Sequence, residues 1–157
     1  MAKEKNNDSQ IAVNRKARYE YFIREEIEAG IVLLGSELKP VRAGRVNIAD
    51  SYASYSREDD GLWLYNAHIE ENKNARIGAH EPTRPRKLLL HKRQMNKLLG
   101  QIRQKGYTLI PLRMYFNKRG IAKIMLGLGE GKKQYEKRDA IKERDWKREK
   151  AALMKRK

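Results

Sequence analysis

The stretch TLIPLRMYFNKRGIAKIMLGL, residues 108–128, contains two apolar runs separated by a short polar segment. Apolar residues occupy every second position of each run, and this period of two is typical of a strand with one buried face. Placing both apolar sets on the same face requires Phe116 opposite Ala122, so the residues between them form the loop of an antiparallel hairpin. Arg113 and Lys123 then point away from the core. The alternating apolar residues are Ile110, Leu112, Met114 and Phe116 in the first run and Ala122, Ile124, Leu126 and Leu128 in the second.

More strand-type sequence precedes this hairpin. VNIADSYASYSRE and LWLYNAHIE flank REDDG, a segment rich in turn-forming residues. IVLL, residues 31–34, is a short apolar run of the same type. The sequence therefore predicts several strands, mostly antiparallel.

Amphipathic helices are predicted on both sides of these strands. Tyr19, Ile23 and Ile27 recur at intervals of four, which predicts a helix over residues 16–29 with a glycine as its stop. Met95, Leu99 and Ile102 give a second helix its apolar stripe, Gly106 ends it, and the exposed loop EPTRPRKLLLHKR leads into it.

A third, shorter helix is expected in SELKPVRAG. Ser36 is a candidate N-cap and Gly44 a candidate end, but Pro40 cannot donate a backbone N–H within the helix. The whole pattern favours a mainly β protein, an OB-fold-like antiparallel β-barrel flanked by two to three α-helices. An open antiparallel sheet covered by helices is the alternative. We expect a disordered start at residues 1–10, a barrel domain at 11–130 and a basic tail at 131–157.

Charge points to a polyanionic partner. The chain of 157 residues has 36 Lys and Arg against 20 Asp and Glu, a net charge of +16. Residues 82–130 contain twelve basic side chains and one acidic one, and residues 131–157 contain twelve and five. There is no Cys, which excludes disulfides and thiolate metal sites. We find no signal peptide and no apolar run that would span a membrane, so we expect a cytoplasmic protein without membrane contact and, when free, a monomer.

Catalytic motifs find little support in the sequence. His68, His80 and His91 lack the HExxH spacing of a zinc site, and Glu25–Glu26 and Asp59–Asp60 fit a helix surface and a turn. GLGEGKK lacks the GxxxxGK[ST] pattern of a phosphate-binding loop. We therefore expect no enzyme activity, no cofactor and no metal.

Binding to structured RNA fits the basic clusters better. NRKAR, RPRKLLLHKR and GKK supply cations for phosphate contacts, and they lie among strands and loops rather than on one recognition helix. The RNP motifs of an RRM and a suitably framed KH GXXG loop are absent from the sequence.

Longer motifs carry a family resemblance. IAVNRKARYEYFIREEIEAGIVLLGSE, RAGRVNIADSY, PTRPRKLLLHKRQMNKLLG and KKQYEKRDAIKERDW together resemble the bacterial small protein B family, the SsrA-binding proteins, from Ile11 to the C-terminus. The resemblance implies an OB-like barrel that binds the tRNA-like domain of transfer-messenger RNA (tmRNA, SsrA) and carries it to stalled ribosomes for trans-translation. It implies RNA contacts at Asn14, Arg15, Lys16, Arg18, Glu28, Arg86, Lys87, Leu89 and Lys123.

The resemblance also assigns the basic tail to the ribosome, near the decoding centre of the small subunit. The tail contains good helix formers but few apolar residues, so we expect it to be disordered alone and helical inside the empty message channel. Two alternatives are a ribosome-associated OB-fold protein that acts without tmRNA and an RNA-processing enzyme. The implied ribosome contacts are Gly131, Lys132, Lys133, Tyr135, Lys137, Arg138 and Trp146.

Overall fold

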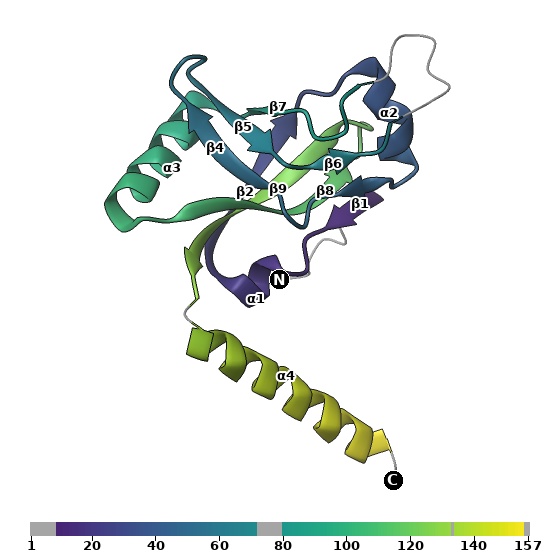
Figure 1. Ribbon diagram of the computed structural model, residues 1–157, viewed down its shortest axis with the longest axis vertical. Coiled ribbons are helices and arrows are strands. Elements are labelled where there is room, and N and C mark those ends of the chain that lie inside the picture. The colour runs from purple at the N-terminus through teal and green to yellow at the C-terminus, as the bar shows by residue number, and fades with distance from the viewer. Residues whose placement is uncertain (1–8, 72–79, 133, 156–157) are drawn as a thin grey trace.

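The structure of the chain is a computed structural model that describes residues 9–71, 80–132 and 134–155. An antiparallel β-barrel forms its body, and one long helix extends away from the barrel (Figure 1). The ring strands are β2 (Tyr21–Ile31), β4 (Tyr52–Ser56), β5 (Gly61–Tyr65), β7 (Arg86–Leu89), β8 (Thr108–Phe116) and β9 (Ala122–Gly131). Their hydrogen-bonded order is β8, β4, β5, β7, β2, β9 and back to β8. The predicted OB-fold-like barrel is therefore confirmed, and the ring is closed.

Within the described residues, three further strands lie outside this ring. β1 (Ser9–Val13) pairs with the second half of β8, while β3 (Val46–Asn47) pairs with β6 (His68–Ile69). Since β1 begins at Ser9, residues 9 and 10 belong to a strand rather than to a disordered start. Residues 1–8 lie outside the described residues.

The hairpin of β8 and β9 has the predicted register, with Phe116 opposite Ala122. The even-numbered apolar residues of β9 all lie in the main core, as expected. The register of β8 shifts between Pro111 and Arg113, however, so the strand changes the face it presents along its length. Ile110 and Leu112 consequently pack in a second cluster with Ala17, and the prediction that they share the face of Met114 is wrong.

The predicted helix at residues 16–29 is wrong for most of its length. Only α1 (Ala17–Glu20) is helical, and β2 follows it directly. A spacing of four residues satisfies the period of a strand as well as that of a helix, so Ile23 and Ile27 could not discriminate between the two. In β2 the buried side chains Ile27, Ala29 and Ile31 face the barrel core at alternate positions.

The segment expected as an exposed loop before the second helix contains β7, which pairs with β5 and with β2. The helix itself is confirmed as α3 (Lys92–Lys105), and Gly106 ends it in the left-handed conformation at φ 65°. α3 contributes Leu98 to the barrel core.

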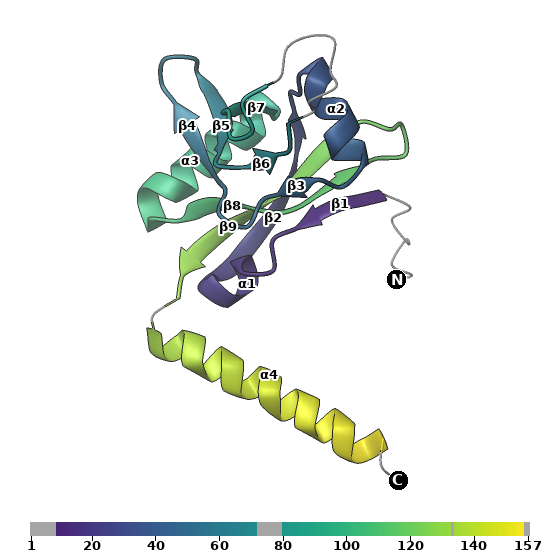
Figure 2. The ribbon, with the colours of Figure 1, turned by 45° about the vertical axis from the view of Figure 1, so that its right-hand side comes forward.

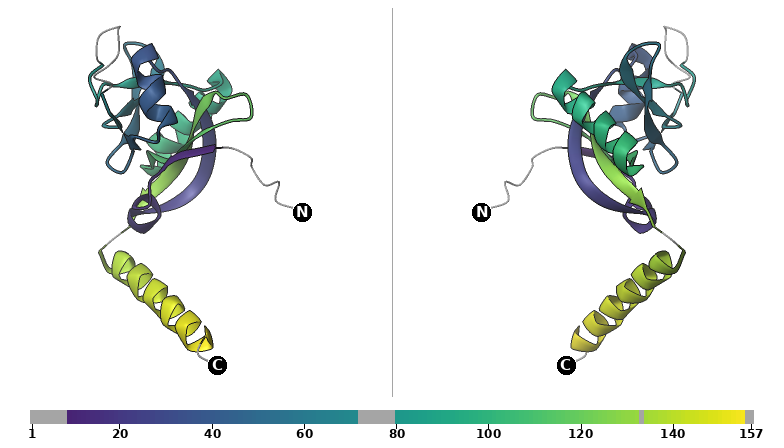
Figure 3. Two further views of the ribbon diagram at one scale, coloured as in Figure 1. Left: turned by 90° about the vertical axis from the view of Figure 1, so that its right-hand side faces the viewer. Right: turned by 90° about the vertical axis from the view of Figure 1, so that its left-hand side faces the viewer.

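The third predicted helix is also present, as α2 (Gly35–Arg42), with Pro40 inside it. It begins one residue before the expected cap, and the Ser36 hydroxyl lies 3.0 Å from Nδ1 of His80 instead. Gly44 follows the helix at φ 74°, a conformation that glycine adopts without strain. α2 and α3 lie on opposite sides of the barrel (Figure 3).

Most of the tail forms one helix, α4 (Gln134–Lys155). It runs away from the barrel in every view (Figures 1 and 2). The helical form that we predicted for the tail is confirmed, and its disorder in the free chain stays a prediction.

Candidate nucleic-acid interface

A groove on the surface of the barrel gathers three residues that the resemblance implies as RNA contacts. Gly30 of β2 pairs with Leu89 of β7 on one side and with Lys123 of β9 on the other. Glu28 lies two residues earlier on β2, so the three side chains line one groove of about 610 Å³ although they come from distant parts of the sequence. The barrel thus assembles a surface that no single segment contains.

Gly30 lines this groove and has no side chain, so Leu89 packs closely against its backbone. A Cβ at this position would lie 3.2 Å from Cβ of Leu89, which is closer than ordinary van der Waals contact. Leu89 is 52% exposed beside it, so an apolar side chain faces solvent in the groove. Lys87, two residues earlier on the same strand, is half-buried on the same face of β7. An apolar surface flanked by cations suits a ribose or base edge beside phosphates.

The carboxylates of β2 in this groove have partners within the barrel. The Tyr115 hydroxyl donates a hydrogen bond to Glu28, and the Arg113 guanidinium lies 4.5 Å from the centre of the Tyr115 ring. These contacts hold the Glu28 carboxylate in place in the groove, where it can accept a hydrogen bond from a ligand. The sequence did not predict that Tyr115 would bind Glu28. The alternation of β8 did place Tyr115 on the same face as Arg113, because both residues lie at odd-numbered positions beside Met114.

Two further glutamates hold cations at the edge of the groove. Glu26 forms an ion pair with Arg18 of α1, and Glu25 lies 3.6 Å from Nζ of Lys97 on α3. Both glutamates line the groove, so each pair places a cation beside it. Because all four side chains are substantially exposed, each pair adds little to stability.

The position of Arg86 differs from the one that the sequence predicted. Arg86 was placed among the RNA contacts, but its side chain is 0% exposed and points into the barrel. Its Nε donates to Oε2 of Glu37 at 2.5 Å, one Nη donates to the Ala67 carbonyl at 2.7 Å and the other to the Pro82 carbonyl at 3.0 Å. A cation with all these partners holds α2 and two connecting segments together and is not available to a phosphate.

Glu37 is the centre of this buried network. Burial opposes its ionisation, but hydrogen bonds from Arg84, from the Leu34 N–H and from Arg86 outweigh the burial and lower the pKa of Glu37. Burial also lowers the pKa of Arg86, while the Glu37 carboxylate opposes that effect. The network is a structural ion pair, and the sequence contained no periodic signal for it.

A second group of predicted contacts surrounds α1. Arg15, Lys16 and Arg18 are exposed there, whereas Asn14 is only 5% exposed. Nδ2 of Asn14 donates to the Pro111 carbonyl at 2.9 Å, so this residue fixes the start of α1 to β8. The three cations thereby have a defined base on the barrel, and their contact with RNA stays a prediction.

The tail is attached beside the same helix. The Lys132 N–H donates to the Glu20 carbonyl at 2.9 Å, and Nζ of Lys132 donates to the Arg18 carbonyl at 3.0 Å and lies 4.8 Å from the centre of the Phe22 ring. Figure 2 shows α1 next to the strand end from which the tail departs. Lys132, the first residue after the barrel, is therefore fixed relative to the predicted RNA contacts.

The structure describes the remaining predicted tail contacts to different extents. Gly131 and Arg138 are exposed, and Trp146 is 61% exposed on α4. Tyr135 and Lys137 belong to α4, and Lys133 lies outside the described residues. The cations of α4 whose side chains the structure describes are exposed, which leaves them available to a polyanion.

Two kinds of feature are not found in the part of the chain that the structure describes. No group of three His, Cys, Asp or Glu residues there is arranged to hold a metal ion. None of the described helices has the length and apolar character needed to cross a bilayer.

Comparison with known proteins links this chain to one group of proteins. The family model described as SmpB protein matches residues 11–156. An SsrA-binding protein of Shouchella clausii is 52% identical over 139 residues, which cover 88% of this chain and 87% of that protein. An SsrA-binding protein of Wolbachia pipientis wMel is 53% identical over 145 residues, covering 92% and 96%. A solved chain described as "tmRNA-SmpB: a journey to the center of the bacterial ribosome" has a TM-score of 0.65 and 43% identity, covering 85% of this chain and 95% of that one.

Proposed function

The chain belongs to the SmpB protein family, and on that premise we propose that it binds tmRNA and acts with it at stalled ribosomes in trans-translation. It is an adaptor that makes and breaks no bond: the barrel binds the tRNA-like domain of tmRNA, and the tail contacts the ribosome. This assigns it to the cytoplasm, where bacterial ribosomes work.

The observation that carries the barrel's role is the groove at Gly30. Glu28, Leu89 and Lys123 meet there, and Glu26 and Glu25 hold cations from α1 and α3 at its edges. Phosphate contacts from those cations would position the RNA, while the Glu28 carboxylate and the Leu89 side chain would contact riboses or base edges between the phosphates. A groove built from three strands recognises a shape, which suits a folded RNA better than a single strand.

The tail's role follows from its attachment and its charge. Lys132 fixes the root of the tail beside α1, so the direction in which α4 leaves the barrel is set at the predicted RNA surface. We propose that α4 enters the empty message channel near the decoding centre, where ribosomal RNA phosphates neutralise its Lys and Arg side chains. Tyr135 and Trp146 are then available to stack on exposed bases, at about 1–3 kcal/mol per base.

A gel-shift titration at several salt concentrations tests the central claim. We expect the protein to bind the tRNA-like domain of tmRNA far more tightly than an unrelated hairpin RNA of similar length. Affinity should fall with a log–log slope of roughly −0.9 per phosphate neutralised on duplex and about −0.7 on single strands. Equal affinity for both RNAs, together with tight binding to ribosomes alone, would favour a ribosome-associated protein that acts without tmRNA.

A further inference from the structure

A pocket of about 380 Å³ lies on the surface of the barrel beside the C-terminal half of α3. It forms where β4 and β8 are paired at Ala53 and Leu109 alone, so side chains of α3 border the opening between the two strands. Its volume is within the range of small-ligand sites. The pocket shares no residue with the groove at Gly30, and the RNA contacts implied by the family resemblance include none of its residues.

Three tyrosines line this pocket, Tyr52, Tyr55 and Tyr107. The Tyr52 ring stacks on the Tyr65 ring, with the ring centres 5.4 Å apart and the planes 23° from parallel, yet Tyr52 is 44% exposed. Tyr55 and Tyr107 are half-buried because they pack against the barrel core. The pocket therefore presents fixed aromatic rings to solvent, and a single unpaired base stacks on rings of this kind.

Two guanidinium groups lie beside these rings. Arg57 and Arg103 line the pocket and are exposed, and neither forms an ion pair with a described carboxylate. The Tyr55 hydroxyl donates a hydrogen bond to Asp60, which raises the pKa of Tyr55. The two arginines lie near enough to this hydroxyl to oppose the rise. Their positive charge is therefore concentrated at the pocket and available to an anion.

α3 supplies cations from the groove at Gly30 to this pocket. Gln94 lines the groove and Arg103 lines the pocket, and the rise along the helix between them is about 14 Å. An RNA bound in the groove can therefore reach the pocket along α3. The helix contains no Asp or Glu, and its exposed basic residues are Lys92, Arg93, Lys97, Arg103 and Lys105.

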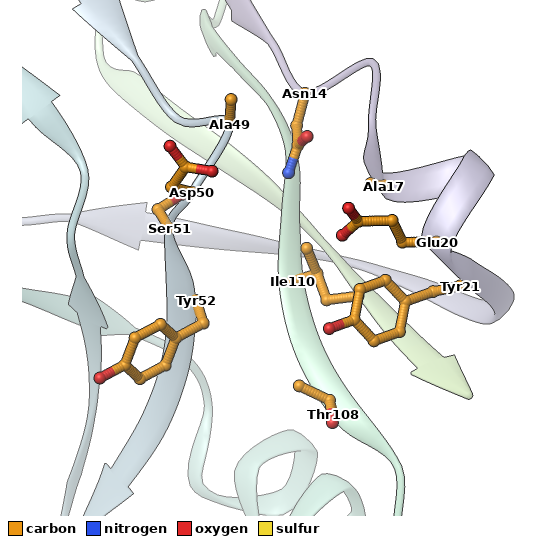
Figure 4. A pocket seen from close by; sticks show the side chains of 10 residues that line it. All are labelled: Asn14, Ala17, Glu20, Tyr21, Ala49, Asp50, Ser51, Tyr52, Thr108 and Ile110. Atoms are coloured by element: carbon orange, nitrogen blue, oxygen red, sulfur yellow. The ribbon is translucent and has the colours of Figure 1, made fainter. Parts of the chain in front are cut away.

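A neighbouring pocket has the opposite charge. Tyr52 and Thr108 line both pockets, but Figure 4 shows the carboxylates of Glu20 and Asp50 around the neighbouring one. No carboxylate of the described residues lines the pocket beside α3, and the acidic residues of the turn after Arg57 do not line it either. A phosphate is therefore repelled by one pocket and attracted by the other.

We propose that the pocket beside α3 binds one unstacked nucleotide of tmRNA. The base lies against the tyrosine rings, the phosphate binds Arg57 and Arg103, and the cations of α3 hold the RNA backbone between the groove and the pocket. Because every base has an aromatic face, the pocket selects an unpaired nucleotide rather than a particular base. The inference rests on the proposed function, since it takes the tRNA-like domain of tmRNA as the source of the nucleotide.

The phosphate contact is tested by titrating the full-length protein into the labelled tRNA-like domain at several salt concentrations. We expect Arg103→Gln to weaken binding several-fold and to make the log–log salt slope shallower by about 0.7, because the nucleotide in the pocket is single-stranded. Arg42→Gln is the matched control, exposed on α2 on the opposite side of the barrel from α3, and should keep the wild-type affinity and slope (Figure 3). Equal values for the two variants overturn the proposal.

The stacking contact is tested at Tyr107 in the same titration. Tyr107→Leu removes the ring and should weaken binding roughly tenfold at an unchanged salt slope, whereas Tyr107→Phe should bind like wild type. The melting temperature of each variant separates a lost contact from a lost fold. If Tyr107→Leu does not fold, Tyr52→Leu and Tyr52→Phe provide the same comparison. A folded Leu variant that binds as tightly as its Phe counterpart overturns the proposal.

Binding to ribosomes distinguishes the source of the ligand. If the pocket variants bind the tRNA-like domain like wild type but bind ribosomes more weakly, the pocket takes a ribosomal ligand, and the proposal fails while the proposed function stands. If wild type does not prefer the tRNA-like domain to an unrelated hairpin RNA, the proposed function itself fails.

Discussion

The barrel and the helix α4 carry their charges in opposite ways. In the barrel, Arg86 and Glu37 are both 0% exposed and each has several fixed partners. On α4, Glu143 and Lys147 approach to 3.3 Å but are 69% and 73% exposed. The buried pair of the barrel is therefore part of its architecture, whereas the exposed charges of the tail remain free to follow the phosphates of a partner. A rigid region can select one RNA shape, and an exposed helix can adapt to a channel.

Removing the tail should give the largest effect on function. We expect deletion of residues 134–157, which keeps the Lys132 anchor, to leave tmRNA affinity and the melting temperature of the barrel nearly unchanged but to abolish peptide tagging. The reason is that Lys132, which the variant keeps, makes the described hydrogen bonds between barrel and tail, and the first part of α4 adds only a small contact with α1. Tagging of a stalled nascent chain in a reconstituted translation system measures it. Tagging at the wild-type rate by the shortened protein would contradict the division of roles.

Breaking the buried network should give the largest effect on stability. We expect Arg86→Ala to lower the free energy of unfolding by about 3–5 kcal/mol, because it leaves the Glu37 carboxylate buried without one of its two cations. Chemical denaturation measures the loss. Lys87→Ala, one residue further along β7, is the matched control and should change stability little. Equal stability of the two variants would show that Arg86 is not structural.

The contrast between these two neighbours explains what the sequence could predict. The period of two in residues 108–128 predicted the hairpin and its register because each apolar residue has only two possible faces. The sequence around a cation does not indicate whether its side chain is buried. RPRK resembles a solvent-exposed basic cluster, and only the fold shows that Arg86 binds Glu37, 49 residues earlier in the chain. The RNA contacts at Glu28, Leu89 and Lys123 were predicted from the family resemblance. Their convergence required the pairing of β2 with both β7 and β9, which local patterns do not encode.

The helix predicted at residues 16–29 shows the limit of periodicity itself. The spacing of Ile23 and Ile27 fits the period of a helix and that of a strand. This segment forms a strand because β2 pairs with β9 over most of its length. Long-range hydrogen bonding overrode the local helical signal, as tertiary context commonly does.

Acid should weaken the same buried network. The pKa of Glu37 is lowered in the folded protein, so its contribution to stability is complete above its ordinary value of 4.5 and is lost as the pH falls through the lower folded value. We expect the free energy of unfolding to decline below pH 4.5 in wild type. Glu37→Gln should be less stable at neutral pH and should show a shallower decline. Parallel pH profiles for the two proteins would exclude Glu37 as the titrating group.

Substitution of Lys123 tests the groove at Gly30. The residue is half-buried at the groove, and we expect Lys123→Ala to weaken tmRNA binding several-fold without lowering the melting temperature. If its ammonium group contacts one phosphate, the salt slope should become shallower by roughly 0.7–0.9. Lys118→Ala, exposed in the turn between β8 and β9, is the matched control. A variant with the affinity and salt slope of the control would remove Lys123 from the RNA surface.

The smallest expected effect concerns the tail's own helix. Glu143 and Lys147 form an i,i+4 pair in the favourable order, worth about 0.3–0.5 kcal/mol, so Glu143→Gln should reduce the helix content of α4 only slightly. The measurement is circular dichroism at 222 nm on a peptide of residues 131–157 in dilute buffer, with and without a polyanion. We expect the wild-type peptide to be mostly unfolded alone, because its exposed Trp146, Leu153 and Met154 bury too little to offset the ordering entropy. The polyanion should induce the helix in both peptides and reduce the difference between them. A peptide that is fully helical without a polyanion would show that the tail, like the barrel, is ordered before it meets its partner.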